Sequence, residues 1–120
     1  MTAVTTPTTA PITTTGPDGS REYALARFHF EAKAYTDAAR LLETVVAAEP
    51  ANLSVRLLLA RSLYHSAQLS RAAAELRRIL EQDPAEDYAR LLLGRTLQRQ
   101  GRPEEARAQL RLAAAMGTEL

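Results

Sequence analysis

A spacing of 34 residues, which separates Pro50 from Pro84, recurs through this chain and constrains its fold more than any other feature. Sets of matching apolar and small residues follow the same spacing. They are Leu25, Leu59 and Leu93; Ala26, Ala60 and Gly94; Ala38, Ala72 and Ala106; and Leu42, Leu76 and Leu110. A fixed period of this length is typical of structural repeats that stack on one another. Stacked repeats present a long surface to partners and rarely carry chemistry, so the sequence indicates protein interaction.

Inside each period, apolar residues recur about every 3.6 residues, which is the spacing of an amphipathic helix. The pattern predicts six helices, over residues 20–33, 36–48, 52–66, 70–82, 85–100 and 103–116. Thr36, Asn52 and Ser70 have the side chains that cap a helix N-terminus. Gly101 is expected as a left-handed C-terminal cap, and Pro103 suits a first helical turn. The connections are short, so neighbouring helices are expected to be antiparallel.

Residues 1–18 differ in composition from the rest of the chain. Eight of the first fifteen residues are Thr, and Pro7, Pro11 and Pro17 are interspersed with them. Thr and Pro disfavour helix, and few large apolar side chains are present to form a core. We therefore expect a disordered tail over residues 1–18, followed by a folded domain over residues 19–120.

The charge balance argues against two classes of partner. Fifteen basic residues face fourteen acidic ones, so the net charge of +1 creates no general attraction to nucleic acid or to an anionic membrane. Fourteen of the fifteen basic residues are Arg, a bias that we interpret as that of a GC-rich bacterial genome. Neither a signal peptide nor an apolar run of about 18 residues is present. We expect a cytoplasmic protein that binds neither nucleic acid nor membrane.

The residues needed for common active sites are missing. The chain has no Cys, and its two histidines, His29 and His65, do not have the spacing of metal ligands. It has no glycine-rich phosphate loop, and no Ser/His/Asp set can be argued from the pattern. We therefore expect no metal, no cofactor and no enzymatic activity.

The helix–turn–helix period of 34 residues resembles the tetratricopeptide repeat. The resemblance covers three repeats, at about residues 19–52, 53–86 and 87–120, and it implies an all-α fold: a right-handed α-solenoid of three helical hairpins. A further apolar position of the pattern is filled by Val45, Ile79 and Ala113. The first aromatic residue of the pattern is absent, and its positions hold Glu22, Arg56 and Arg90.

In proteins that this chain resembles, the first helix of each repeat lines a concave groove that holds a peptide or a partner helix. The groove residues that this resemblance implies are Tyr23, Arg27, Phe30, Leu57, Arg61, Tyr64, His65, Tyr88, Leu91, Arg95 and Arg99. Less prominent positions of the same frame are Ser20, Glu31, Ser54 and Gln98.

Within this groove, Arg27, Arg61 and Arg95 repeat with a strict period, and aromatic residues flank them. Arg and Tyr anchor many interfaces, and Arg can hold a carboxylate through two parallel hydrogen bonds. We hypothesise that the groove binds an acidic, apolar-containing peptide of a partner protein. An alternative is that the Arg row pairs with neighbouring carboxylates and only solubilises the groove.

The third repeat departs from the others on the face that would receive a fourth. Arg107 stands where earlier repeats have Ala, and Ala114 stands where they have Val46 and Leu80, so we expect the array to end there. Partly exposed apolar side chains would remain at this end, namely Leu110, Leu112 and Met116. They offer an alternative function, a self-associating scaffold protein that forms a weak homodimer through the end of the array.

The first repeat also carries an unusual residue. Phe28 stands where the later repeats have Ser62 and Thr96. We interpret it as packing locally at the N-terminal edge, while docking of a partner or of Ile12 from the tail is the alternative.

Overall fold

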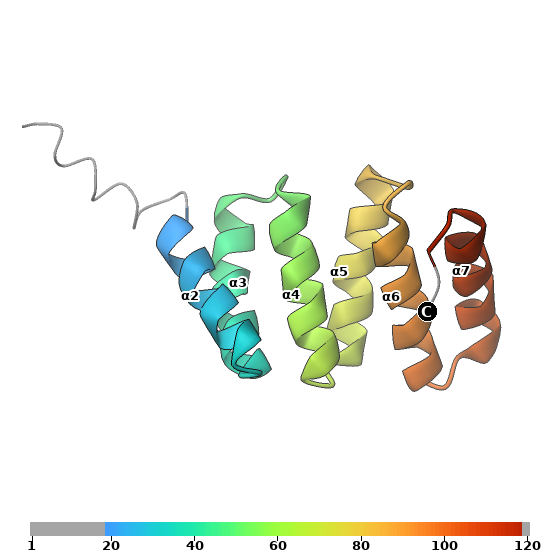
Figure 1. The fold of residues 1–120 in the computed structure, drawn as a ribbon, viewed down its shortest axis with the longest axis horizontal. Coiled ribbons are helices and arrows are strands. Elements are labelled where there is room, and N and C mark those ends of the chain that lie inside the picture. The colour runs from blue at the N-terminus through green and yellow to red at the C-terminus, as the bar shows by residue number, and fades with distance from the viewer. Residues whose placement is uncertain (1–18, 119–120) are drawn as a thin grey trace, which may run out of the picture.

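The computed structural model describes residues 19–118, which form six α-helices and no strand (Figure 1). The helices are α2 (Ser20–Glu31), α3 (Tyr35–Ala48), α4 (Leu53–His65), α5 (Leu69–Gln82), α6 (Asp87–Arg99) and α7 (Pro103–Ala115). Each helix packs against the next along the chain, and successive pairs form three hairpins in a row. This arrangement is the predicted all-α solenoid. The predicted disordered tail over residues 1–18 lies outside the described residues.

The predicted helix ranges agree with the observed ones to within two residues at each end, but two of the three predicted N-caps are wrong. Asn52 does cap α4, because its side-chain oxygen accepts a hydrogen bond from the N–H of Val55 at 3.2 Å. Thr36 and Ser70 instead lie inside the first turns of α3 and α5, which begin one residue earlier than predicted. The tight turns before these two helices explain the difference.

In each of these turns one residue, Ala34 or Gln68, hydrogen-bonds to the end of one helix and is also the N-cap residue of the next. The N–H groups of Ala34 and Gln68 donate to carbonyl oxygens five residues back, each at 2.8 Å. The residue before each of them has a left-handed backbone, with φ of 64° at Lys33 and 61° at Ala67. The equivalent turn of the third repeat uses Gly101, with φ of 75°, so the predicted left-handed cap is confirmed. No separate loop remains in which a capping side chain would fit.

Small side chains let the two helices of each hairpin cross closely. Ala38, Ala72 and Ala106, in the second helices, are at most 1% exposed. In the third hairpin a Cβ added to Gly94 would lie 2.5 Å from the side chain of Leu110, too close for any residue but glycine without a shift of that side chain. Leu, Val and Ile side chains fill the space on either side of these crossings, and the buried clusters extend from one repeat into the next.

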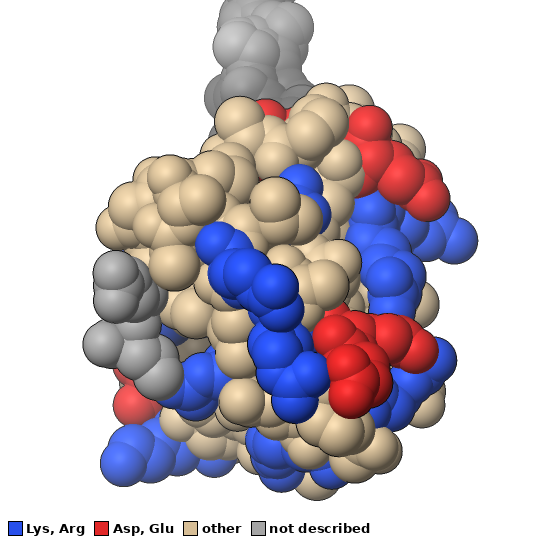
Figure 2. Space-filling model, turned by 90° about the vertical axis from the view of Figure 1, so that its right-hand side faces the viewer, with Lys and Arg blue, Asp and Glu red and all other residues tan. Residues whose placement is uncertain are grey.

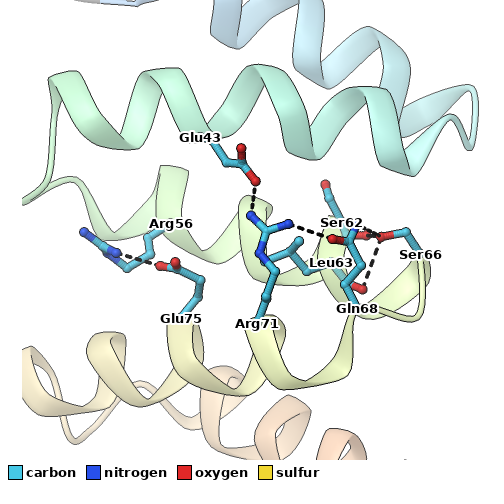
Figure 3. Close-up of polar contacts among 8 residues, drawn as sticks. All are labelled: Glu43, Arg56, Ser62, Leu63, Ser66, Gln68, Arg71 and Glu75. Carbon is cyan, nitrogen blue, oxygen red and sulfur yellow. Dashed lines mark hydrogen bonds and ion pairs between the residues drawn. The ribbon is translucent and has the colours of Figure 1, made fainter.

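The arginines that replace the aromatic of the repeat pattern have a structural role. Arg56 is only 5% exposed, and its Nη1 donates to Oε1 of Glu75 in α5 at 2.6 Å (Figure 3). Its Nη2 donates to the carbonyl oxygen of Pro50 at 3.1 Å. Arg90, one period later, makes the same two contacts, to Gln109 and to the carbonyl of Pro84. Each of these two arginines therefore ties the turn before its own helix to the second helix of its hairpin.

The first prediction concerns the strained turn residue Ala67. A residue with a Cβ is disfavoured in the left-handed region by about 1–2 kcal/mol, and glycine is not. Because Ala67 is exposed, the substitution Ala67→Gly loses no packing. It is expected to raise the free energy of unfolding by about 1 kcal/mol, measured by urea denaturation. Ala74→Gly, in the middle of α5 and also exposed, serves as the control and should lower the stability. If both substitutions destabilise the protein equally, the turn assignment is wrong.

The second prediction concerns Arg56. Removal of one partner from a mostly buried ion pair leaves the other charge uncompensated, so Arg56→Ala is expected to cost about 3 kcal/mol of unfolding free energy. Arg40→Ala, which removes an exposed ion pair with Asp37, should cost less than about 1 kcal/mol. Thermal or urea unfolding of the two variants tests this difference, and similar losses in both would contradict it.

Candidate functional site

Two neighbouring hollows open on the surface that α2, α4 and α6 share. The first hollow has a volume of about 360 Å³ and is lined by Tyr23, Arg27, Phe30, Glu31, Ser54, Leu57, Leu58 and Arg61. The second has a volume of about 210 Å³ and is lined by Arg61, Tyr64, His65, Tyr88, Leu91, Leu92 and Arg95. Every one of these residues comes from the first helix of a repeat. The side chain of Arg61 belongs to both hollows and separates them.

The structure brings the residues predicted for the groove together on this surface. All but Arg99 line one of the two hollows, and Arg99 lies beside them over the ring of Tyr64. Of the less prominent positions, Ser20 lines a separate hollow towards α3, and Gln98 lines a hollow at the α7 end. Their use in binding stays a prediction, whereas their grouping follows from the stacking of equivalent helices.

Arg61 is held between aromatic rings. Its guanidinium carbon lies 4.7 Å from the ring centroid of Phe30 and 5.9 Å from that of Tyr88. These are cation–π distances, and the partly buried guanidinium gains from them because it is partly removed from water. Arg61 therefore positions the two rings as well as carrying charge, and its replacement would disturb the shape of both hollows.

The other two arginines of the row have different surroundings. Arg27 is exposed and lies 3.7 Å from the carboxylate of Glu31, four residues along α2. Arg95 is partly buried in the wall of the second hollow, and within residues 19–118 it has no hydrogen bond and no ion pair. The second hollow has no Asp or Glu in its lining, whereas the first has Glu31. The two hollows therefore differ in the charge that they offer to a ligand.

An aromatic cluster forms the wall of the groove where α4 ends. His65 stacks on Tyr35, with ring centroids 4.6 Å apart and an interplanar angle of 24°, and it contacts Phe30 and Tyr64 edge-on. Arg99 lies 4.7 Å from the ring of Tyr64 and donates to its carbonyl oxygen at 3.0 Å. The pKa of His65 is held below its ordinary value. The larger cause is partial burial of the ring, and the smaller cause is the positive charge of Arg61 and Arg99.

Tyr35 belongs to this cluster but is not one of the groove residues predicted from the sequence. It lies at the start of a second helix, and second-helix positions are counted as core or array-end positions in the repeat frame. The tight turn after α2 places it beside the end of α4 in the next repeat, where His65 lies. One sequence signal could have indicated this contact. An aromatic residue follows the turn after α2, and a His lies at the end of the first helix of the next repeat.

The described part of the chain has neither a metal-binding cluster nor a membrane-spanning helix. No group of three or more His, Cys, Asp or Glu side chains in residues 19–118 lies close enough together to hold a metal ion. None of the helices in that range has the length and the apolar character that a membrane crossing requires.

The fold and the groove together define an α-helical repeat protein with a concave face built from its first helices. The sequence matches the family model described as Tetratricopeptide repeat at residues 29–92 and 68–118. These matches span more than half of the chain, so the chain belongs to the tetratricopeptide repeat family. A search of curated proteins found no match to the sequence.

Solved structures show the same fold. A MamA variant superposes with a TM-score of 0.79 and 23% identity, covering 84% of this chain and 74% of that one. MamA from Desulfovibrio magneticus RS-1 gives 0.78 and 22%, covering 89% of this chain, which spans only 61% of that protein. SycD, a type III secretion chaperone of Yersinia enterocolitica solved with a peptide of the translocator YopD, gives 0.76 and 19%, covering 82% and 76%. At these identities the likeness shows the fold alone.

A third prediction follows from the surroundings of His65. Arg61 disfavours the charged imidazolium, so Arg61→Gln is expected to raise the pKa of His65 towards its ordinary value. An NMR titration of the His65 ring protons measures this change directly. The control is Arg78→Gln, which removes the same charge from an exposed position in α5 and should leave the titration unchanged. An unchanged His65 titration in Arg61→Gln would contradict the geometry of the cluster.

Proposed function

We propose that this protein is a non-enzymatic adaptor that binds an acidic segment of a partner protein in the groove formed by α2, α4 and α6. The observation that carries the proposal is the second hollow, which combines two guanidinium groups with aromatic and Leu side chains and has no carboxylate in its lining. Such a site favours a ligand that brings carboxylates together with apolar side chains.

The two arginines of the second hollow have different parts in this proposal. Arg61 is already engaged by the rings of Phe30 and Tyr88, so it supplies a fixed positive wall. Arg95 has no partner among the described residues, so its fork of N–H donors is available for a carboxylate of the ligand. Leu91 and Tyr88 then form the apolar floor on which a neighbouring side chain of the ligand packs.

The first hollow is expected to contribute less binding energy for an acidic ligand. Glu31 lies in its lining and within ion-pair distance of Arg27, so it offsets the positive charge there. A ligand that extends across both hollows would therefore place its carboxylates over repeats two and three and its apolar or neutral part over repeat one. This proposal assigns an orientation of charge along the groove as well as a ligand class.

One comparison supports the mode of binding. The SycD structure holds a peptide of YopD, so a chain with this fold has been solved with a peptide ligand. The identity of 19% carries no information about the sequence of the ligand for the present chain.

The fourth prediction tests Arg95. Selection of a random peptide library on the immobilised protein is expected to enrich peptides that contain Asp or Glu together with Leu or aromatic residues. Arg95→Glu should weaken binding of the enriched peptides by about 10- to 100-fold in fluorescence anisotropy, since a hydrogen bond to a charged group contributes about 1.5–3 kcal/mol.

The matched control is Arg78→Glu, which makes the same charge change on an exposed position of α5, away from both hollows. It should keep peptide affinity, and both variants should melt close to the wild type. Enrichment of basic or purely apolar peptides would refute the acidic ligand class. Equal losses in the two variants would show that only net charge matters and that the groove is not the binding site.

A further inference from the structure

The N-terminal face of α2 is an apolar surface that later repeats bury. Leu25 is 47% exposed and Phe28 is 65% exposed. Their equivalents in α4, Leu59 and Ser62, are at most 2% exposed, because α3 covers that face of α4. The ring of Phe28 contacts that of His29 edge-on, at 5.8 Å between ring centroids, and this local packing leaves most of the side chain exposed. The alternative contact with Ile12 lies outside the described residues. Among residues 19–118, the face of α2 therefore has no second helix that would cover it.

The opposite end of the array offers such a helix. Figure 2 looks onto the α7 end, where basic side chains cross uncharged surface and acidic groups lie beside them. A hollow of about 360 Å³ lies there, lined by Gln98, Pro103, Arg107, Leu110 and Arg111. Within the array, the equivalent faces of α3 and α5 cover the first helix of the following repeat. The outer face of α7 is thus a second-helix face with no first helix packed against it among residues 19–118.

The two end faces differ in side-chain size from the faces inside the array. Phe28 of α2 is much larger than Ser62 and Thr96, which fill its position inside the array. The start of a second helix lies beside the end of the next first helix, as Tyr35 lies beside His65, so Phe28 of a following copy would lie near Pro103 and Arg107 of α7. Pro103 is smaller than its equivalents in the earlier repeats, whereas Arg107 is larger than the Ala residues that it replaces. Side-chain size therefore does not select the partner, and the charges of the two ends carry that argument.

The charges of the two ends are complementary. Glu43 of α3 pairs with Arg71 of α5, and Arg77 of α5 pairs with Glu105 of α7 (Figure 3 shows the first pair). Arg77 is the equivalent of Glu43 one repeat later, and Glu105 is the equivalent of Arg71. The second pair therefore repeats the first with the positive and negative residues exchanged. The next pair in this series would join Arg111 to an acidic residue of a following second helix, and the described chain has no such helix.

Asp37 supplies the missing carboxylate. It is the residue of the first repeat at the position of Arg71 and Glu105, and it is exposed. If a second copy continued the array, its Asp37 would lie opposite Arg111 of the first copy and would carry the sign that the series requires.

We propose that two copies of this chain associate head to tail, with the α2 face of one copy packed on the α7 face of the other. The contact is heterologous, so it leaves one free face of each kind and can continue into short linear assemblies. The proposal does not depend on the acidic-ligand groove, because the residues of the second hollow, which carry the groove proposal, do not line the hollow at the α7 end.

The test uses two variants of the full chain, each with one blocked face. Phe28→Glu blocks the α2 face, and Ala114→Glu blocks the α7 face; both positions are exposed, and thermal melting checks that each variant is folded. Sedimentation velocity should show that the average mass of the wild type rises with concentration and that each variant alone is monomeric. A mixture of the two variants should form a 1:1 dimer that does not grow further.

Other results would overturn the proposal. A wild type that stays monomeric at every concentration would exclude the association. Self-association of Ala114→Glu alone would indicate an α2-to-α2 contact, and self-association of Phe28→Glu alone would indicate an α7-to-α7 contact. Arg95→Glu should leave the association unchanged, and loss of association in that variant would assign the contact to the groove instead.

A charge exchange tests the register. Asp37→Arg and Arg111→Asp should each lower the association constant several-fold as single substitutions, and the two together in one chain should restore it, because the pair is then reversed. Arg40→Asp, next to Asp37 on the same helix face, changes the charge without a partner on α7 and should not be rescued by Arg111→Asp. Failure of the D37R/R111D combination to restore association would refute the proposed register.

Discussion

The burial of each first helix under the second helix of the preceding repeat is the interaction on which the rest of this structure depends. A single hairpin of this size exposes one apolar face, and only a neighbouring hairpin can cover it. The small residues at positions such as Ala72 bring the helices close enough for Leu and Ile side chains to fill the interval. The same dependence explains why the ends of the array differ from its middle. Leu25 is exposed and Leu59 is buried although both occupy one position of the repeat, because within residues 19–118 only Leu59 has a preceding second helix packed over it.

The candidate binding surface on the first helices is a consequence of that packing. The core is formed between the first and second helices. The opposite face of the first helices, on which the two hollows open, can therefore carry side chains that the core does not need. The aromatic residues there are not independent of each other. His65, Tyr35 and Phe30 contact one another, and Arg61 lies over Phe30, so the wall between the two hollows is a packed unit that keeps its shape without a ligand. A preformed wall lowers the entropy lost on binding, and it leaves Arg95 as the guanidinium in the second hollow without a partner in the described chain.

The repeat period was sufficient to predict most of the fold from sequence, including the number of helices, their ranges and the grouping of the groove residues. It failed where one repeat's environment differs from the next. The predicted N-caps at Thr36 and Ser70 are wrong because Lys33 and Ala67 adopt a left-handed backbone, which shortens the turns before α3 and α5. The residue types Lys and Ala do not indicate a positive φ, so the sequence could not predict these turns. The contact of Tyr35 with His65 was missed because it joins a second helix to the first helix of another repeat, and the period describes each column separately.

The arginines show most clearly what a periodic sequence leaves undetermined. Arg56 is buried and fixed by a carboxylate and a carbonyl, and Arg61 is held by two rings. Arg95 faces an open hollow, and Arg111 occupies the repeat position at which Glu43 and Arg77 pair with the following second helix. The side chain is the same in each case, and its effect depends on how much water it has lost and on which acceptor or ring lies within reach. Burial turns the charge into a structural tie, ring contact turns it into a positioning element, and the absence of an acceptor leaves it for a ligand. The repeat frame therefore predicts where an arginine lies, while its partners decide what that arginine does.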